Sequence, residues 1–453
     1  MNPEAALAAL RLSPVVAALV APVLREAERR GLAVYLVGGP VRDLLLRQSL
    51  RDVDLIVESG ASCSAEELAR AAAPADAEVV GYDRFGTVRL QCGAAAIDLA
   101  STRRERYARP GALPSVEPGS LEDDLRRRDF TVNAMALPLT RAAARRAPAA
   151  RGGDLPLIEV DGARRDLEAR VLRILHPRSF HDDPTRALRA ARLAARLGFR
   201  LSRGARSALR SALRDGVFGA VSGERLRREI EKLFADASLG VDPSAALRLL
   251  DAWYVLAALE PGLALPRPAV VPLRRLGRAI AAPPWSIPST SSRISRPWAV
   301  GLALWLAELG AALRRRTLRR LAVRGEAAER VEQFPQQRDR WLRALVRSRG
   351  RGAADALLGA LDEEAALALW CCAASAGRRR IERWAREDRT RRIPVSGGDL
   401  LAEGLSGPAV GAGLARIRVA WLDGAVRSRE EALALARELV GRERRRASRM
   451  QRR

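Results

Sequence analysis

Histidine and cysteine, the residues that build most metal and disulfide sites, are scarce in this sequence. Among 453 residues there are four cysteines and two histidines. The cysteines form no CxxC pair and have no even spacing, which excludes a disulfide framework and a zinc ribbon. His181-Asp182 superficially suggests a metal-dependent phosphohydrolase, but that site requires several histidines. A Ser/His/Asp hydrolase is excluded because no nucleophile-elbow motif is present.

Long apolar runs and export signals are also missing. Charged residues interrupt the first thirty residues, which lack a basic start and a cleavage site, so we expect no signal peptide. The apolar stretch from Trp298 to Ala307 is bounded by Arg296 and Glu308, and no run of about 18 uncharged residues occurs. The sequence therefore predicts a protein without membrane contact, and its few unpaired cysteines fit a cytoplasmic location.

Acidic residues are fewer than basic residues in this sequence. The chain has 79 lysines and arginines against 53 acidic residues, a formal net charge of +26. Lys232 is the only lysine, as codon use in a G+C-rich genome would produce, so part of the arginine excess reflects base composition. The remaining positive field favours polyanionic partners such as nucleic acid.

Hydrophobic patterns change along the chain from strand-like to helical. Short aliphatic runs predict strands at 34–38, 53–57, 85–90 and 95–100, and Pro40 suits the first turn of a helix between the first two. This strand-rich part ends near residue 140. From about 165 onward, Ala, Leu and Arg recur with a period near 3.6, which predicts helices.

Breaks in the helical pattern suggest domain boundaries. Residues 283–297 are rich in Pro and Ser and predict a linker or an exposed loop, and residues 391–408 interrupt the pattern again. At roughly 150 residues per domain the length suggests about three units. We place boundaries near 165, 245 and 350.

The first motif with chemical content combines a glycine turn with acidic residues. Gly38 and Gly39 close a strand and precede Arg42, and glycines without Cβ let backbone N–H groups approach phosphate oxygens. Asp52 and Asp54 stand two apart on the next predicted strand, so they share a face at a spacing suited to divalent metals. The alternatives are an ordinary turn and a solvent-facing edge strand.

A third acid, Asp98, stands on another predicted strand, 95–100. Three carboxylates can hold one magnesium ion on the phosphates of a nucleotide and another beside an attacking hydroxyl. A lone acid in a strand is the alternative interpretation.

The second motif is DLRRRDFTVNAMAL, residues 124–137. Its arginines, Arg128 among them, can clamp phosphate groups. Asp129 and Asn133 stand four apart, so on a helix they would bond to one ribose. A solvated basic turn is the alternative.

The third motif is HPRSFHDDPTRALRAARLAARLGF, residues 176–199. Asp183 and Arg186 would share one face of a helix. There the carboxylate could accept a hydrogen bond from the edge of a nucleotide base and the guanidinium could donate two, so the protein would take the place of a pairing base. The alternative is a surface ion pair.

Taken together, these segments resemble a known family. LVGGPVRDLLL, RDVDLIVE, FGTVRL, IDLASTRRERY, RRDFTVNAMA, the third motif and SGERLRREIEKLF occur in the order found in class II tRNA nucleotidyltransferases (CCA-adding and A-adding enzymes) and bacterial poly(A) polymerases. The resemblance is strong over residues 34–235. A segment near the end of the chain resembles, more weakly, the tail domain of that family.

The resemblance implies roles for individual residues. The magnesium-binding pair is Asp52 and Asp54, with Asp98 as a third catalytic acid. The implied nucleotide-binding residues are Gly38, Gly39 and Arg42 at the triphosphate, Asp129 and Asn133 at the ribose, Asp183 and Arg186 at the base, and also Arg128 and Arg189. One departure is Asp182-Asp183, where the family often has Glu-Asp.

The resemblance also implies an α+β fold and a function. A nucleotidyltransferase head with a mixed β-sheet (1–165) would precede an all-helical neck (166–245), body (246–350) and tail (351–453). The implied activity is template-independent addition of the 3′-terminal CCA, or only its A, to tRNA from CTP and ATP with Mg²⁺. Poly(A) polymerases typically carry a basic segment where this chain has GYDRFGTVRL, which favours tRNA as substrate. The alternatives are a poly(A) polymerase and an inactive basic RNA-binding protein.

Overall fold

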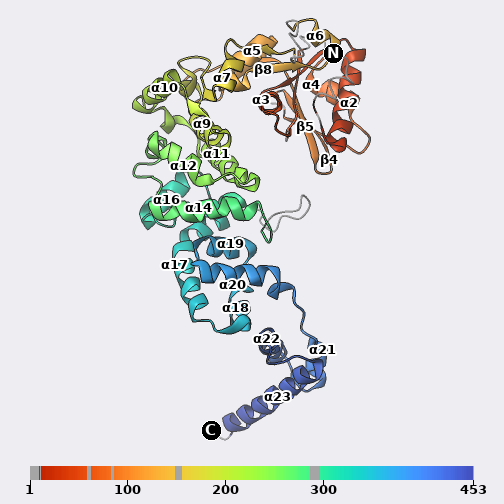
Figure 1. Cartoon of the computed structure of the whole chain (residues 1–453), viewed down its shortest axis with the longest axis vertical. Coiled ribbons are helices and arrows are strands. Elements are labelled where there is room, and N and C mark those ends of the chain that lie inside the picture. Colours follow the sequence, from red (N-terminus) through yellow and green to blue (C-terminus); the bar gives the residue numbers. More distant parts are fainter. Residues whose placement is uncertain are drawn as a thin grey trace. The chain divides into compact units, whose positions relative to one another are not determined.

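A computed structural model of the chain describes residues 10, 12–50, 52–58, 63–82, 86–147, 156–285 and 296–451 (Figure 1). The chain forms two compact units. The first unit comprises residues 1–229 and 246–263, and the second comprises residues 230–245 and 264–453. The predicted division at 165, 245 and 350 remains a prediction.

A seven-stranded sheet is the foundation of the first unit. Its order is β3-β4-β5-β2-β1-β8-β9, and β2 and β5 are parallel whereas the other neighbours are antiparallel. The strands are β1 (Ala33–Val37), β2 (Asp54–Glu58), β3 (Glu78–Tyr82), β4 (Thr87–Cys92), β5 (Ala95–Ser101), β8 (Met135–Pro138) and β9 (Ile158–Glu159). Together with the many helices that follow, this mixed sheet confirms the predicted α+β class.

Helices and two short ribbons complete the first unit. The helices are α2 (Pro14–Arg29), α3 (Gly39–Leu45), α4 (Ala65–Ala72), α5 (Leu121–Arg126), η2 (Thr131–Asn133), α6 (Arg141–Ala144), α7 (Ala163–Glu168), α8 (Ser179–Asp182), α9 (Arg186–Leu197), α10 (Arg203–Arg214), η3 (Val217–Ala220) and α13 (Val255–Leu259). The ribbons pair β6 (Arg103–Arg106) with β7 (Ser115–Pro118), and β10 (Val171–Leu172) with β11 (Arg200–Leu201). Helices α11 (Gly223–Ala235) and α12 (Pro243–Ala252) belong partly to each unit.

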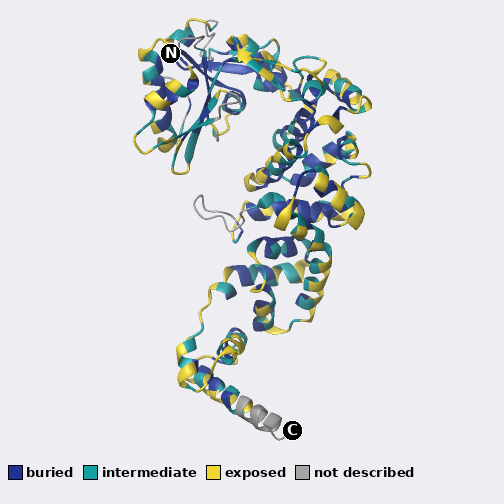
Figure 2. Cartoon of the chain, turned by 180° about the vertical axis from the view of Figure 1, so that it is seen from behind, coloured by how far each residue is buried: buried dark blue, intermediate teal, exposed yellow. Residues whose placement is uncertain are grey.

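Burial of apolar side chains fixes the central strands of the sheet. Every residue of β1 is buried, as are the three middle residues of β2, and Figure 2 shows the central strands in the buried colour. Helices α2 and α4 contact each other and β5. Tyr35 and Ile56 pack with residues of α5, β8 and α6 in one core cluster. A strand buried on both faces reads as a continuous apolar run, which is why 34–38 was recognisable.

The second unit is helical in the part that the structure describes. Its elements are η4 (Asp236–Leu239), α14 (Arg267–Ile280), α15 (Pro297–Leu306), α16 (Ala311–Arg320), α17 (Gly325–Arg347), α18 (Gly350–Leu358), α19 (Glu363–Cys372), α20 (Ser375–Arg386), η5 (Asp388–Thr390), α21 (Gly397–Ala402), α22 (Pro408–Leu422) and α23 (Arg429–Gln451). Gly301 in α15 packs against Phe234, and a Cβ there would lie 2.2 Å from the aromatic ring. Only glycine allows this close approach.

The predicted elements agree with the observed ones except in the residues at which they begin and end. Strands appear at all four predicted places, and Pro40 lies in the first turn of α3. Residues 391–408 do interrupt the long helices, although they contain the short α21. The predicted linker lies largely at residues 286–295, outside the described residues. None of the helices described here is long and apolar enough to cross a membrane.

Candidate active site

A cavity of about 190 Å³ in the first unit brings together most of the residues that the sequence singled out. It is lined by Gly39, Pro40, Arg42, Asp43, Asp52, Asp54, Asp129, Asn133, Arg189, Arg192, Leu193 and Arg196. These residues come from α3, the start of β2, the segment before β8, and α9. The other predicted site residues, Gly38, Asp98, Arg128, Asp183 and Arg186, lie beside the lining residues rather than in the cavity wall.

The glycine turn between β1 and α3 forms one wall. Gly38 has φ +76° and ψ −132°, a backbone conformation that other residues adopt only under strain. A Cβ at Gly38 would lie 2.6 Å from Nη1 of Arg128. Arg128 is held in this position by Asp124, whose Oδ2 accepts a hydrogen bond of 2.9 Å from Nη2. The turn therefore needs glycine both for its conformation and for the guanidinium pressed against it.

The acidic pair lies at the beginning of β2. Asp54 is the first residue of the strand, whereas Asp52 precedes it, so the prediction that both acids lie within one strand was wrong for Asp52. Both side chains nevertheless line the same cavity. Asp98 on β5 stands directly opposite Asp54 in the parallel register. It accepts two hydrogen bonds of 2.8 Å from Arg89 on β4.

Burial raises the pKa of Asp54 to about 6, a value that includes the upward effect of the negative charges of Asp98 and Asp52 and the opposing effect of Arg128. Within the described residues, no side chain donates a hydrogen bond or forms an ion pair to the carboxylates of Asp52 and Asp54. Two such acids repel each other unless a cation joins them. The pair therefore fits a divalent cation.

The acids do not form a complete ligand set by themselves. In the part of the chain that is described, no three His, Cys, Asp or Glu side chains gather as ligands for a metal ion. A divalent cation held by Asp52 and Asp54 would thus need oxygen ligands from a substrate or from water, as magnesium sites at phosphates commonly do.

The raised pKa of Asp54 predicts how cation binding depends on pH. A proton would compete with a cation held at this carboxylate, so we expect cation affinity to fall as the pH falls through about 6. At pH 5 about one tenth of the Asp54 side chains are ionised, and we expect Mn²⁺ to bind about tenfold more weakly than at pH 7.5. Titration of the free protein with Mn²⁺, followed by electron paramagnetic resonance, measures this. Equal affinity at both pH values would contradict the prediction.

Opposite the acids, a chain of hydrogen bonds runs from α3 toward α9. Arg42 is buried and donates to Oδ1 of Asp43 at 2.6 and 2.8 Å and to Oδ1 of Asn133 at 2.6 Å. Asn133 in turn donates to Oδ1 of Asp129 at 3.0 Å. The other oxygen of Asp129 accepts from Arg189 at 3.1 Å. Burial alone would raise the pKa of Asp129, but Arg189 and Asn133 hold it below its usual value.

The network continues through Asp183. Its Oδ2 accepts from Arg189 at 3.0 Å, and its Oδ1 accepts from the Thr185 hydroxyl at 2.6 Å and from Arg225 of α11 at 2.8 Å. Burial would raise the pKa of Asp183, but Arg189 and the other donors lower it to about 2. Arg186 is 3% exposed and donates to the Ser179 hydroxyl and to the Arg127 carbonyl.

Two predictions about local structure in this region were wrong. Asp129 and Asn133 do not share an α-helix, because Phe130 is extended and only residues 131–133 form a 3₁₀ turn. They still meet, through the hydrogen bond described above. Asp183 and Arg186 do not share a helix face either, since Asp183 ends α8 and Arg186 begins α9, with Pro184 between them. A proline keeps the residue before it out of the helical conformation.

The structure adds site residues that the sequence reasoning missed. Arg192 and Arg196 line the cavity from α9, and Asp43 lines it from α3. Arg196 donates to Oδ2 of Asp43 at 3.2 Å. A signal was available in the spacing, because Arg189, Arg192 and Arg196 are three and four residues apart and so share one face of a helix.

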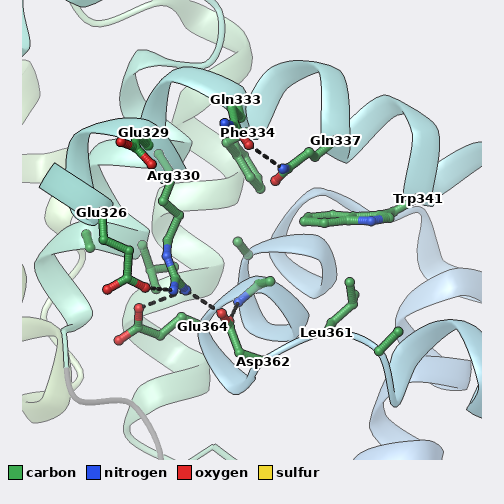
Figure 3. A pocket seen from close by; sticks show the side chains of 16 residues that line it. Glu326, Glu329, Arg330, Gln333, Phe334, Gln337, Trp341, Leu361, Asp362 and Glu364 are labelled. Carbon is green, nitrogen blue, oxygen red and sulfur yellow. Dashed lines mark hydrogen bonds and ion pairs between the residues drawn. The ribbon is translucent and has the colours of Figure 1, made fainter.

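A second cavity, of about 310 Å³, lies in the second unit and differs in charge (Figure 3). Arg330 is shared there by three acids, Glu326, Asp362 and Glu364, at 2.8, 2.6 and 3.2 Å. Trp341 lies at the other end of the cavity in Figure 3. Four carboxylates and one guanidinium line it, which disfavours a phosphate ligand. Of these two cavities, the one lined by Asp52 and Asp54 is therefore the better candidate for a nucleotide site.

Comparison with known proteins points to one family. Residues 34–173 match the poly A polymerase head domain. The chain is 46% identical to the A-adding tRNA nucleotidyltransferase of Aquifex aeolicus over 36% of this chain and 18% of that protein. It is 38% identical to the CC-adding tRNA nucleotidyltransferase of Deinococcus radiodurans over 51% of this chain and 56% of that protein. The chain thus spans less than two thirds of these relatives.

Solved structures match over a greater length. A CCA-adding enzyme of Thermotoga maritima complexed with tRNA is 25% identical, with a TM-score of 0.65 over 96% of this chain and 98% of that one. An apo form of a CCA-adding enzyme is 26% identical, with a TM-score of 0.68 over 96% of this chain and 98% of that one. Residues 34–173 are thus similar to a poly A polymerase head domain, and nearly the whole chain is similar in fold to CCA-adding enzymes.

Proposed function

We propose that this protein adds nucleotides from CTP and/or ATP to the 3′ end of tRNA without a nucleic-acid template, releasing pyrophosphate. The observation that carries the proposal is one cavity holding two unpaired acids, Asp52 and Asp54, opposite the network of Arg42, Asn133 and Asp129. Relatives named A-adding and CC-adding enzymes, and neighbours bound to tRNA or CTP, support it.

The triphosphate would lie along the glycine turn and the arginines. The backbone of Gly39 lines the cavity, whereas the Gly38 N–H donates to the Met135 carbonyl at 3.2 Å and shapes the turn. Arg42 and Arg189 add fixed positive charge. Asp52 and Asp54 would hold Mg²⁺, which when bound supplies charge stabilisation for an in-line displacement at the α-phosphorus. The 3′-hydroxyl oxygen of the RNA would form a bond to the α-phosphorus as it loses its proton to solvent, and the bond from the α-phosphorus to the α–β bridging oxygen would break, so that this oxygen leaves as part of pyrophosphate.

The sugar and base would be recognised beyond the triphosphate. Asn133 and Asp129, already joined by a hydrogen bond, present an amide and a carboxylate to ribose hydroxyls. Asp183 and Arg186 would read the base edge, with Arg186 oriented by the Ser179 hydroxyl and the Arg127 carbonyl. The Nε of Arg186 is buried without a hydrogen-bond partner among the described residues, which leaves a donor for a ligand.

The base-reading role of Arg186 predicts a change in selectivity. Arg186→Ala should raise incorporation of GTP and UTP relative to the preferred nucleotide by roughly tenfold, because a lost bidentate contact costs about 1–3 kcal/mol of discrimination. The ratio among the four nucleotides is measured within one protein, so a general loss of stability does not affect it. Arg206→Ala, an exposed arginine on α10, is the matched control. Unchanged ratios would remove Arg186 from the base-reading site.

The proposed reaction is tested with three tRNA transcripts, ending before CCA, after C and after CC. Each is offered CTP and ATP, separately and together, with Mg²⁺. We expect extension that stops at the terminal adenosine. Extension only from the CC end and only with ATP identifies an A-adding enzyme, and complete rebuilding identifies a CCA-adding one.

Two outcomes of the transcript experiment would overturn the proposal. Long adenosine tails on unstructured RNA would replace it with a poly(A) polymerase. RNA binding without pyrophosphate release would indicate an inactive RNA-binding protein. The composition of the chain favours folded RNA, because aromatic side chains make up only 4% of its residues and single-strand binding depends on them.

A further inference from the structure

Three charged side chains form a row across neighbouring strands of the sheet. Asp54 on β2 stands opposite Asp98 on β5, and Asp98 stands opposite Arg89 on β4. Directly paired residues on adjacent strands project from the same face. The row therefore consists of two carboxylates followed by a guanidinium. Its first member, Asp54, lines the cavity of the proposed cation site.

Arg89 occupies both oxygens of Asp98. Its Nε donates to Oδ1 and its Nη2 to Oδ2, each at 2.8 Å, which is the bidentate geometry of a strong charge-assisted pair. Asp54 receives no such partner among the described residues. One acid of the row is thus neutralised by the protein itself, and the other is left for an external cation.

The pair is accessible to solvent, so it can exchange partners. The side chain of Arg89 is 43% exposed and that of Asp98 is 32% exposed. A divalent cation approaching Asp98 would have to displace Arg89 and would meet its charge.

We propose that Arg89 is a positioning residue that serves as the resident counter-ion of Asp98 and limits the free protein to one divalent cation, held by Asp52 and Asp54. Asp98 binds a second cation only when Arg89 is removed or drawn away. This inference rests on the proposed function, because it concerns the acids of the proposed transferase site.

The experiment titrates Mn²⁺ into the full chain without nucleotide or RNA at pH 7.5, with electron paramagnetic resonance counting bound ions. Wild type should bind one ion. Arg89→Ala should bind a second ion or bind the first about tenfold more tightly, the factor expected on removing a unit charge roughly 6 Å from a divalent ion in water. Arg89→Lys should behave like wild type. Arg70→Ala removes an exposed arginine on α4, paired with Glu66, and is the matched control.

A double variant assigns the gain to Asp98. Adding Asp98→Asn to Arg89→Ala should abolish the extra binding, and circular dichroism confirms that each variant is folded. A merely structural role for Arg89 would shift the melting temperature without changing the Mn²⁺ isotherm. The inference is overturned if Arg89→Ala matches wild type in number and affinity of ions, or if the gain survives in the double variant.

The same titration separates this inference from the proposed function. Asp54→Asn should lose the single ion of wild type. If Asp54→Asn still binds it, the proposed cation site is wrong. If Asp54→Asn loses the ion but Arg89→Ala is indistinguishable from wild type, only the role of Arg89 fails.

Discussion

Asp54→Asn is expected to reduce nucleotide addition by about 1,000-fold while leaving tRNA affinity within about twofold of wild type. The variant removes one of two carboxylates that face the cavity and fit the cation. A bound metal contributes several kcal/mol to charge stabilisation, and about 4 kcal/mol corresponds to a factor of 1,000. tRNA affinity should survive because it depends on many distributed arginines. Single-turnover addition and filter binding measure the two quantities separately.

The same variant should make the metal-free protein more stable at neutral pH. The pKa of Asp54 is raised from its usual 3.8 to about 6, so the folded protein binds more protons than the unfolded chain between those pH values. Stability from this group therefore falls as the pH rises from about 4 to 6, and the full cost is present above 6. Two pKa units correspond to an upper limit of about 3 kcal/mol. Thermal melts with a chelator present measure the gain.

Controls distinguish a site effect from a general one. Asp52→Asn should also abolish addition, whereas Asp339→Asn, an exposed acid on α17, should change neither addition nor stability. Turnover near the wild-type rate in either site variant would refute the cation assignment. A stability loss in metal-free Asp54→Asn would show that the carboxylate has a partner that favours its charge.

Arg189→Ala is expected to lower the free energy of unfolding by about 2–4 kcal/mol. Arg189 bonds to Asp129 and Asp183, and it lies 3.9 Å from Glu229. Removing one partner of a buried charge network leaves the other charges uncompensated, which typically costs about 3–5 kcal/mol of stability. We expect a smaller loss here because the Arg189 side chain is 26% exposed. Urea denaturation at pH 7.5 measures the loss.

The pH dependence of this loss is a further check. In wild type the pKa of Asp183 is lowered to about 2, so its contribution to stability is present above pH 4 and disappears as the pH falls toward 2. Without Arg189 much of that contribution is absent. The difference between variant and wild type should thus be largest at neutral pH and shrink on acidification. Arg210→Ala on α10 is the exposed control, and a cost below about 1 kcal/mol for Arg189→Ala would contradict the prediction.

Local patterns in the sequence predicted the elements of the fold well. Continuous apolar runs identified β1 and β2, because strands buried on both faces carry such runs. The glycine pair and Pro40 located the turn into α3, and the spacing of Asp52 and Asp54 identified two of the acids that line the cavity. These features depend on backbone conformation and near neighbours, which the sequence displays directly.

Contacts between distant segments had to come from the tertiary structure. The register of β2, β5 and β4 brings Asp54, Asp98 and Arg89 into one row, and nothing local in FGTVRL or IDLAST indicates that pairing. The spacing of Asp129 and Asn133 suggested a helix, but Phe130 between them is fully buried with an extended backbone, and only residues 131–133 form a 3₁₀ turn. The sequence by itself determined the strands, the helices and the acidic pair; which charges neutralise one another was decided only by tertiary packing, because ion pairs form between groups that folding brings together from remote positions.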